Sequence, residues 1–398
     1  MPETHAKLTC SGAARWLGCP GSVKLSECYP QAGSIYTAEG SLAHLYLEKS
    51  VKGDTGGMAD ALAKADEFYG KHPELDGSAD TMQDTIDEMM SWIVTMYEAE
   101  KREDPAAQIF SEQRVDLSAY IPGGFGTTDV TIARTGRLHI IDLKYGKGVA
   151  VSAKDNPQLR LYALGMLEML DMVFDVDDVQ MTIYQPRIGN VSTDAISADE
   201  LRAWGEDVIR PAAKLALSDD APLAAGDWCR FCPARRACRV LAGYNLSLEK
   251  YRKKLTLSPD EIASILGRID GLVRWADDLK AGALETIQEG GEIPGWKVVA
   301  GRSIRRFRGD VPEKDIVAAA EDAGYAKPML YETRMLSLSQ IEKVMGKKTF
   351  AEALGGYVER PEGKPTLAPE SDKRPSLYGQ KARDVFADEI ENGEIPFA

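Results

Sequence analysis

The spacing of apolar residues predicts helices through the first hundred positions. The strongest pattern lies in residues 81–101, where apolar side chains recur every three or four positions and would share one helical face. Residues 38–51, which carry His44, and residues 58–70 follow weaker patterns of the same period. One further short helix is expected near residues 11–17, within an otherwise irregular N-terminus.

The hydrophobic period changes to two after this helical region, and such alternation is typical of strands. Three strands are predicted there, with a tight turn at Thr135-Gly136 between the last two: 108–115, 128–133 and 138–143.

Helix and strand signals then alternate. Asn156-Pro157 begins a predicted helix that continues to residue 170. A strand over 179–185 follows, and Ser197 with Glu200 forms a capping box that opens another helix. The order of these elements predicts a mixed α/β fold.

The C-terminal third differs in character. Ser258-Pro259-Asp260-Glu261 is a helix start with proline at the first helical position, and this helix is expected to reach residue 288. A hairpin around Gly301-Arg302 and helices over 312–323 and 339–354 are predicted next. Pro, Lys, Ser and Glu dominate residues 360–380, which predicts a mobile linker. The expected domains are a main domain over 1–244, a helical and hairpin accessory domain over 245–358, and a linker with a tail over 359–398.

Composition narrows the class of protein. The chain has 398 residues, 44% hydrophobic and 28% charged, as is typical of soluble globular proteins. It has no run of about 18 apolar residues, and its first residues lack the apolar core of a signal peptide. We therefore expect a cytosolic protein without a membrane partner. The formal net charge of −14 opposes a general coat of nucleic acid but permits a local basic groove.

Two acidic residues and one lysine lie where neighbouring strands could present them together. Asp129 ends the stretch Gly126-Thr127-Thr128-Asp129, and Asp142-Leu143-Lys144 ends the next predicted strand. Side chains two positions apart on a strand share a face, so Asp142 and Lys144 should meet at one site. Paired carboxylates can hold a hard divalent cation, and a lysine beside them suits metal-assisted cleavage of a phosphodiester. The alternative is a solvated pair on an edge strand.

These residues belong to an ordered set of four short motifs: Gly40 to His44, Gly126 to Asp129, Asp142 to Lys144, and Gln158 to Tyr162. Over residues 10–240 the chain resembles the RecB-like branch of the PD-(D/E)XK nuclease superfamily. The resemblance implies a restriction-endonuclease-like mixed sheet flanked by helices, with an additional α+β region at the C-terminus. The ordered set is more specific than any single motif, because an Asp-x-Lys alone arises by chance in most chains of this length.

The resemblance also implies the ligands of a metal ion. Asp129, Asp142, His44 and the backbone carbonyl of Leu143 would bind Mn²⁺ or Mg²⁺, and the imidazole would favour Mn²⁺. Glu112, on the preceding strand, is a weaker candidate carboxylate. A hydrogen-bonded structural role is the alternative for His44.

Three further residues would take part in the chemistry. The resemblance implies that Lys144 orients or deprotonates the attacking water. Gln158 and Tyr162 lie one helical turn apart on one face, and they would position the motif strands or the nucleic-acid backbone. Core packing is the alternative for Tyr162.

A run of three cysteines follows the nuclease motifs. Cys229, Cys232 and Cys238 form a C-x2-C-x5-C pattern, and stable disulfides are not expected in the cytosol. A closed tetrahedral zinc site or a 4Fe–4S cluster needs a fourth thiolate. No histidine lies near in sequence, so this ligand is expected from the N-terminal trio of Cys10, Cys19 and Cys28.

The resemblance selects among these three. Some RecB-like nucleases, including AddB-type subunits and CRISPR-associated exonucleases, hold an iron–sulfur cluster with one cysteine before the motifs and three after them. The resemblance therefore implies Cys19 as the distant ligand of a 4Fe–4S cluster, which would close a loop of about 210 residues. Zinc bound by the same four cysteines is the alternative.

Basic residues lie between and after these cysteines, and they are expected on the rim of the domain near the path of nucleic acid: Arg230, Arg235, Arg236 and Arg239. Phe231 is expected either to stack on a base or to pack against the cluster. A solvated helix face is the alternative for the basic run.

Together these features predict a metal-dependent DNA exonuclease that acts on single-stranded ends. The whole chain looks like a phage or prophage protein, which implies a role in phage recombination or replication. One alternative is a catalytically inactive nucleic-acid-binding or scaffold protein that retains the cluster. Another is a zinc-bearing interaction protein without a nuclease fold. A homo-oligomer and a phage recombination partner are both compatible with the sequence.

Overall fold

The computed structural model describes residues 6–29, 33–247, 257–299, 311–322, 327–330 and 338–358. The chain forms two compact units, Met1–Ala300 and Gly301–Ala398. The predicted boundary lay after residue 244, whereas the first unit continues to residue 300. The predicted hairpin around Gly301 and the predicted linker and tail after residue 358 lie outside the described residues.

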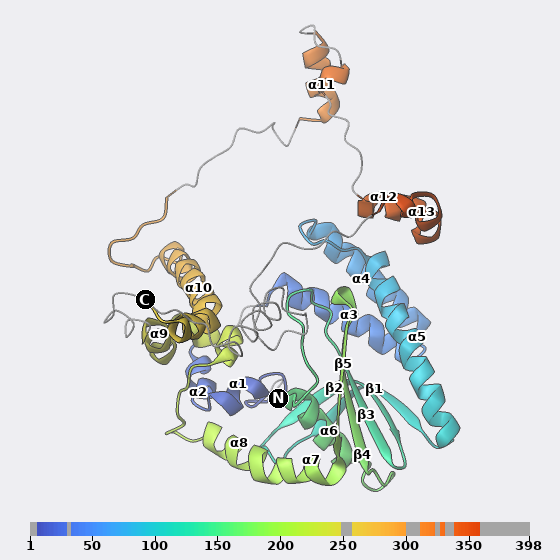
Figure 1. Ribbon diagram of the computed structural model, residues 1–398, viewed down its shortest axis with the longest axis vertical. Helices are drawn as coiled ribbons and strands as arrows, with labels where there is room; N and C mark the ends of the chain where they lie inside the picture. Colours follow the sequence, from blue (N-terminus) through green and yellow to red (C-terminus); the bar gives the residue numbers. More distant parts are fainter. Residues whose placement is uncertain are drawn as a thin grey trace, which may run out of the picture. The chain divides into compact units, whose positions relative to one another are not determined.

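A five-stranded mixed sheet forms the centre of the first unit (Figure 1). Its strands lie in chain order: β1 (Gln108–Asp116), β2 (Phe125–Arg134), β3 (Arg137–Leu143), β4 (Asp178–Gln185) and β5 (Asn190–Ser197). Neighbouring strands are antiparallel except for β3 and β4, which are parallel. A parallel pair needs a crossover connection, and α6 provides it.

The described helices of the first unit are α1 (Ala13–Gly18), α2 (Ser22–Glu27), α3 (Ile35–Val51), α4 (Thr55–Lys71), α5 (Ala79–Glu103), α6 (Pro157–Leu170), α7 (Ala198–Trp204), α8 (Arg210–Ala216), α9 (Arg239–Leu246) and α10 (Pro259–Gln288). Single helical turns also occur at η1 (Pro186–Ile188), η3 (Asp227–Phe231) and η4 (Pro233–Arg236). The second unit contains α11 (Glu313–Asp322), α12 (Leu338–Met345) and α13 (Lys347–Leu354). None of the described helices combines the length and the apolar character that crossing a lipid bilayer requires.

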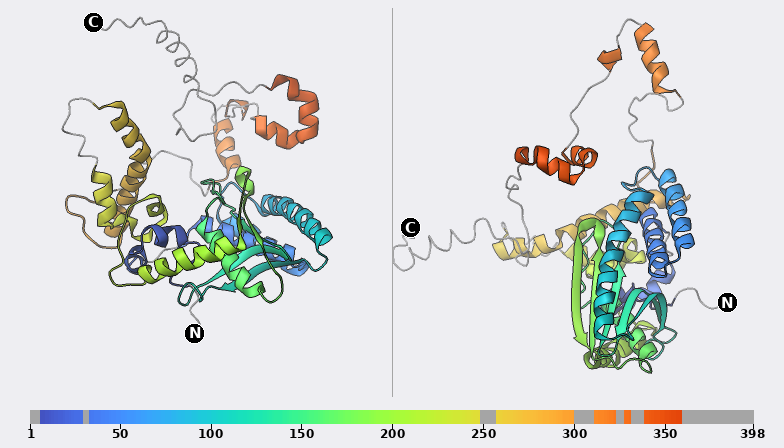
Figure 2. Two further views of the ribbon diagram at one scale, coloured as in Figure 1. Left: turned by 60° about the horizontal axis from the view of Figure 1, so that its bottom comes forward. Right: turned by 90° about the vertical axis from the view of Figure 1, so that its right-hand side faces the viewer.

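The two faces of the sheet bury separate sets of side chains. Helices α3 to α5, blue to cyan in Figure 2, gather on one side, where they pack on Ile141 and Leu143 of β3. Helix α6, together with α1, α7 and α8, packs on the other side against Leu138 and Ile140. The period-two alternation along β3 therefore divides its residues between two cores. The Asp142 side chain lies on the same face of β3 as Leu138 and Ile140, so its carboxylate points toward α6.

Local signals explain where several helices begin. The Asn156 side chain accepts hydrogen bonds from the amides of Gln158 and Leu159, with Pro157 at the first helical position of α6. Ser258 and Glu261 form the predicted capping box of α10. Both helix starts were predicted from the sequence and are confirmed.

Helix α6 lies very close to the sheet. A Cβ atom on its Gly165 would lie 2.6 Å from Cβ of Val115, so only glycine allows this approach of helix to strand. The close packing fixes the height of α6 above β1 and, with it, the position of the polar residues in the first turn of the helix.

Candidate functional site

Two acidic residues of the site lie side by side where two strands separate. The β2–β3 ladder ends at the pair Val130 and Ile141, so Asp129 and Asp142 occupy the next position on each strand. In place of a further ladder bond, the amide of Leu143 donates a hydrogen bond of 2.7 Å to Oδ2 of Asp129. This bond fixes the Asp129 carboxylate at the end of the ladder, with the carboxylate of Asp142 on the adjacent strand.

A third acidic residue, Glu112, extends this row onto β1. The residues on either side of Glu112 pair in register with β2, which places it opposite Asp129. Its backbone has φ 47°, a left-handed conformation that is uncommon outside glycine and is often found at functional sites. Three neighbouring strands therefore present one carboxylate each at the same level of the sheet.

His44 approaches this row from α3. Its Nδ1 atom lies 3.1 Å from Oδ1 of Asp129. Ligand atoms of His44, Glu112 and Asp129 all lie within 4.8 Å of one another, and together these residues form the candidate metal centre. The sequence predicted His44, Asp129, Asp142 and the Leu143 carbonyl as ligands and gave Glu112 a weaker claim. Of the predicted side-chain ligands, His44 and Asp129 belong to this group, and Asp142 does not. Glu112 lies in the candidate metal centre because of the register between β1 and β2, and the sequence does not reveal this register.

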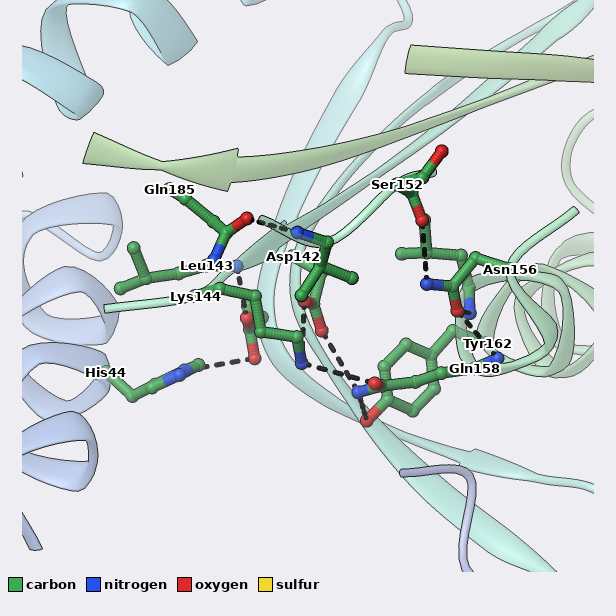
Figure 3. Close-up of polar contacts among 12 residues, drawn as sticks. His44, Asp142, Leu143, Lys144, Ser152, Asn156, Gln158, Tyr162 and Gln185 are labelled. Atoms are coloured by element: carbon green, nitrogen blue, oxygen red, sulfur yellow. Dashed lines mark hydrogen bonds and ion pairs between the residues drawn. The ribbon is translucent and has the colours of Figure 1, made fainter. Parts of the chain in front are cut away.

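A second polar network lies beside the candidate metal centre, on the α6 side (Figure 3). Lys144 Nζ lies 2.9 Å from Oδ2 of Asp142, and it donates to Oε1 of Gln158 at 3.2 Å. The Gln158 amide in turn donates to Oδ1 of Asp142 at 3.2 Å and to the Tyr162 hydroxyl at 3.0 Å. Figure 3 shows His44 on one side of Asp142 and Lys144, and Gln158 with Tyr162 on the other.

Gly126, in the first of the strand motifs, makes room for this network. A Cβ atom there would lie 2.7 Å from Sγ of Cys10 and 2.9 Å from the Tyr162 ring. Any larger residue would therefore displace the ring that backs Gln158. Gly126 acts through packing, whereas Asp129 of the same motif faces the candidate metal centre.

Burial and mutual repulsion shift the pKa values of the site. Burial and then the charge of Asp129 raise the pKa of Glu112 to about 7. Burial raises the pKa of Asp142 to about 6, although Lys144 opposes this shift. Burial disfavours the charged form of His44, but the Asp129 carboxylate outweighs this effect and raises its pKa. Burial is thus the main cause of the raised pKa values of Glu112 and Asp142, and the mutual repulsion of the carboxylates adds to it. A bound cation would favour the charged forms.

The donor set fits a divalent metal ion. Carboxylate and imidazole ligands suit Mn²⁺ and Mg²⁺, and the imidazole gives preference to Mn²⁺. Oδ2 of Asp142 is buried and accepts no hydrogen bond of good geometry within the described residues, although it pairs with the Lys144 charge. Asp142 is only 2% exposed, and this oxygen lies 2.9 Å from the Lys144 ammonium group, so a metal ligand role for Asp142 stays a prediction. The Leu143 contact with Asp129 is made by its amide, and the role of its carbonyl stays a prediction.

The four predicted cluster cysteines line one small pocket, the cysteine pocket, together with Trp228 and Arg15: Cys19, Cys229, Cys232 and Cys238. The amide of Ala224 donates to Sγ of Cys19 at 3.3 Å, which joins the N-terminal helices to the segment before η3. Burial and then the neighbouring thiols raise the pKa of Cys229. Cys10 contacts Phe125 on β2 instead, and Cys28 is exposed.

Two glycines shape the cover of the cysteine pocket. A Cβ atom on Gly18 would lie 2.4 Å from the Trp228 indole, and one on Gly226 would lie 2.6 Å from the same ring. The indole also donates from Nε1 to the carbonyl of Ala224 at 3.0 Å. Trp228 thus closes one side of the pocket against the helix that precedes Cys19.

Sequence comparison supplies the family. A family model described as "Protein of unknown function (DUF2800)" matches residues 5–375. The chain belongs to the DUF2800 family. Among solved structures, it is similar to one titled "Crystal structure of SSO0001", at 12% sequence identity and a TM-score of 0.22. That similarity covers 50% of this chain and 85% of the other.

The four arginines predicted at the rim of this DUF2800 protein have different surroundings. Arg235 forms a bidentate ion pair with Asp278 of α10, with N–O distances of 2.7 and 3.0 Å. Arg236 pairs with Glu285 of the same helix. Arg230 and Arg239 are exposed. Two of the four therefore anchor α10 to the cysteine segment, and two face solvent.

Phe231 lies among these arginines on the surface of the DUF2800 chain. It is 69% exposed, and the Arg230 guanidinium lies 5.3 Å from its ring centre. Of its two predicted roles, packing against the cysteine pocket does not fit this exposure. Stacking on a nucleic-acid base remains compatible with it.

Sequence reasoning missed a buried network that holds α3 in the DUF2800 fold. Glu39 is buried five residues before His44 on α3, where it accepts hydrogen bonds from Tyr69 at 2.9 Å and from Arg187 at 2.8 Å. Arg187 also lies over the Tyr145 ring. Glu39 lies directly before the first motif, and this position could have marked it as a candidate. Its partner Arg187 is 148 residues away, so no local pattern predicts their contact. This network fixes the helix that carries His44.

Proposed function

We propose that this protein is a metal-dependent nuclease of the PD-(D/E)XK type that cleaves DNA from single-stranded ends. The observation that carries the proposal is the adjacency of two groups of residues. His44, Glu112 and Asp129 converge as potential ligands, and Asp142 and Lys144 lie directly beside them. Metal-assisted hydrolysis of a phosphodiester uses these two components, a cation and a positioned polar group that orients water.

The candidate metal centre would hold Mn²⁺ or Mg²⁺ through His44, Glu112 and Asp129, with Asp142 at its edge. Such a cation would polarise the phosphate and lower the pKa of a bound water. Hydrogen bonds within the site already fix the Asp129 carboxylate, through the Leu143 amide. Little reorganisation of Asp129 would therefore accompany binding.

Lys144 would orient the attacking water and stabilise negative charge on the phosphate. Burial disfavours its charged form, but the Asp142 carboxylate outweighs burial and raises the pKa of Lys144. The side chain is therefore an ammonium group in the metal-free protein. Gln158 holds this ammonium group through Oε1, and the Tyr162 hydroxyl holds the Gln158 amide.

The cysteine pocket supports a second part of the proposal. We propose that Cys19, Cys229, Cys232 and Cys238 bind a 4Fe–4S cluster, with zinc as the alternative occupant. Four thiols from the two ends of the domain line one pocket, and thiolates are the ligands that both groups take. A bound cluster would link α1 and α2 to the segment from η3 to α9, and its role would be structural.

Purification without oxygen, followed by metal analysis and a cleavage assay, tests both parts. We expect iron with a visible charge-transfer absorption, and degradation of end-labelled single-stranded DNA that requires Mn²⁺ or Mg²⁺ and stops in EDTA. Zinc in place of iron would revise the cluster and leave the nuclease intact. A fully metallated protein that cuts no form of DNA or RNA would favour the alternative, a nucleic-acid-binding or scaffold protein.

A biological setting follows from the resemblance alone. We propose a role in phage recombination or replication, where single-stranded ends are produced and trimmed. Assembly into a homo-oligomer, or with a recombination partner, is part of this proposal and is tested by sizing the purified protein with and without DNA.

A further inference from the structure

A groove separates α9 and η3 from α10, away from the candidate metal centre. Figure 1 shows α9 and α10 side by side. The groove has a volume of about 230 Å³, whereas one water occupies about 30 Å³ in the liquid. It therefore has room for an organic ligand. The residues used below all line this α9–α10 groove: Tyr244, Asn245, Gly267, Arg268, Gly271, Arg274 and Trp275.

Two hydrogen-bond donors in the groove have no acceptor among the described residues. Asn245 is only 4% exposed, and its Nδ2 atom is buried without a partner. Nε of Arg268 is buried without a partner as well, although Nη2 of the same guanidinium donates to the Tyr244 carbonyl and, at 3.1 Å, to the Ser247 hydroxyl. A buried donor left without an acceptor destabilises the folded protein. Two such donors in one groove indicate a ligand rich in acceptor oxygens.

Two glycines of α10 leave the groove open. Gly267 and Gly271 lie one turn apart, and a Cβ atom on either would meet no atom within 4 Å. Neither has a left-handed backbone, so helix geometry does not require glycine there. Glycine inside a helix is destabilising relative to alanine. The described fold gains no packing in return, whereas a ligand lying against the helix backbone would need the space.

Charge and aromatic surface narrow the class of ligand. Arg268 and Arg274 are basic, and the Arg268 guanidinium lies 4.0 Å from the centre of the Tyr244 ring. Trp275 adds a second aromatic ring to the lining. The lining also contains three acidic residues against four arginines: Asp227, Asp270 and Asp278, and Arg230, Arg235, Arg268 and Arg274. Asp278 is ion-paired with Arg235. Unpaired donors beside basic and aromatic side chains match a phosphate joined to a flat base.

We propose that the α9–α10 groove binds a nucleotide unit, with its phosphate on Asn245 and Arg268 and its base against Trp275. The nucleotide is either free or part of a single strand, since both offer the same phosphate and base. The groove uses no residue of the candidate metal centre, so nucleotide binding does not rest on the proposed nuclease activity. It adjoins the cysteine pocket through Cys229, which lines both.

Binding is measured with the full chain that carries Lys144→Met, in EDTA, so that no strand is cut. Isothermal titration with dAMP and with ATP tests the free nucleotide, and fluorescence anisotropy with a labelled oligothymidylate tests the strand. Binding that Gly271→Leu weakens supports the groove, and the probe that binds identifies the source of the nucleotide. The proposal is overturned if neither probe binds.

A substitution that fills the groove locates the site. Gly271→Leu replaces a helix-weakening residue with a strong helix former, so the melting temperature should stay the same or rise. We expect binding to weaken by at least about tenfold, which corresponds to about 1.4 kcal/mol. Gly70→Leu is the matched control, because Gly70 is a helical glycine on α4 whose Cβ would also meet open space.

Asn245→Asp is the second variant. It has nearly the same shape and replaces the unpaired donor with a negative acceptor, which should repel phosphate and weaken binding at least as much. Unchanged affinity in Gly271→Leu would overturn the proposal, whatever the behaviour of Asn245→Asp.

Discussion

At the scale of single residues, the chemistry proposed for this DUF2800 protein depends on carboxylates that lie close together. Glu112 lies opposite Asp129 on the next strand, and the two repel each other when both are charged. A group placed against its own electrostatic preference is a good candidate for binding or catalysis. Glu112 therefore provides a sharp test of the candidate metal centre.

Glu112→Gln should stabilise the metal-free protein and weaken metal binding at the same time. The substitution removes the repulsion by Asp129, and solvent screening limits the gain, so we expect the melting temperature in EDTA to rise by about 2–4 °C. Affinity for Mn²⁺, measured by titration calorimetry, should fall at least about tenfold through loss of a ligand. Glu67→Gln, on the exposed surface of α4, is the control and should change neither quantity. Unchanged Mn²⁺ affinity in Glu112→Gln would remove Glu112 from the ligand set.

His139 predicts how stability depends on pH. It lies on β3, where Nε2 is 2.9 Å from the Thr182 hydroxyl and Nδ1 has no partner among the described residues. Burial lowers the pKa of His139 to about 4, whereas an unfolded histidine has a pKa of about 6.5. Between these values the unfolded chain binds more protons than the folded one. Stability is therefore retained above about pH 6.5 and falls as the pH drops toward 4.

The measurement is chemical denaturation of wild-type and His139→Gln across this pH range. Glutamine can keep a hydrogen bond to Thr182 but cannot titrate, so the wild-type should lose on the order of 2–3 kcal/mol more stability than the variant. Carboxylates titrate in both proteins and cancel in the difference. Parallel pH profiles for the two proteins would show that His139 does not make this contribution.

The sequence predicted those site residues whose positions follow from spacing within a short motif, and it could not predict contacts between distant segments. Asp142 and Lys144 follow from the two-residue repeat of a strand, and their contact is observed. Glu112 remained a weak candidate because its position opposite Asp129 depends on strand register. The pairing of Arg235 with Asp278 spans 43 residues, and no local pattern indicates it.

At the scale of secondary structure, strong periodicity and caps identified most elements. The predicted strands over 108–115, 138–143 and 179–185 match β1, β3 and β4. The edge strand β5 was missed because Asn190–Ser197 has little apolar character, and only its pairing with β4 makes it a strand. Helix α2 was also missed, since six residues are too few to show a period.

The packing of α6 on the sheet predicts opposite effects for two glycine substitutions. Gly165→Ala places a methyl group against Val115, and overpacking of this kind costs about 1–3 kcal/mol. Gly70→Ala meets open space near the end of α4 and should stabilise the protein by up to about 1 kcal/mol. Thermal denaturation of the two variants beside the wild-type gives both values. A neutral Gly165→Ala would show that α6 can move away from β1.

At the scale of the whole molecule, the cysteine pocket joins the beginning of the domain to its end. Along the chain, Cys19 precedes the first strand of the sheet, and Cys229 follows the last strand and the helices that flank the sheet. If a cluster binds there, it closes a loop of about 210 residues and restricts the unfolded chain. Removing one ligand should therefore destabilise the protein far beyond the local contacts of a single thiol.

Cys232→Ser should lower the melting temperature and the soluble yield more than Lys144→Ala does. Cys232 is buried in the cysteine pocket, whereas Lys144 is partly exposed and makes only local contacts. Cys28→Ser is the matched control, since Cys28 is exposed and lies outside the pocket, and it should behave like the wild-type. Equal melting temperatures for Cys232→Ser and Lys144→Ala would argue against a structural cluster.

The net charge of −14 has a consequence for the proposed DNA binding by the molecule as a whole. Long-range attraction to DNA is not available to an acidic body, so binding must depend on local cations such as Arg230 and Arg239. Only a local groove or rim can therefore guide a strand to the site. The C-terminal unit, from Gly301, contains none of the nuclease motifs. It is therefore a candidate for binding a partner.

The most direct test of the central claim is the rate at which Mn²⁺-loaded protein degrades end-labelled single-stranded DNA, compared between Lys144→Met and Lys71→Met. Lys71 is an exposed lysine on α4 that pairs with Glu67, so its substitution controls for loss of one positive charge. We predict that Lys144→Met loses at least about 100-fold in rate while its fold and Mn²⁺ binding persist, and that Lys71→Met cleaves like the wild-type. Equal rates in the two variants, or no cleavage by the metallated wild-type, would contradict the account.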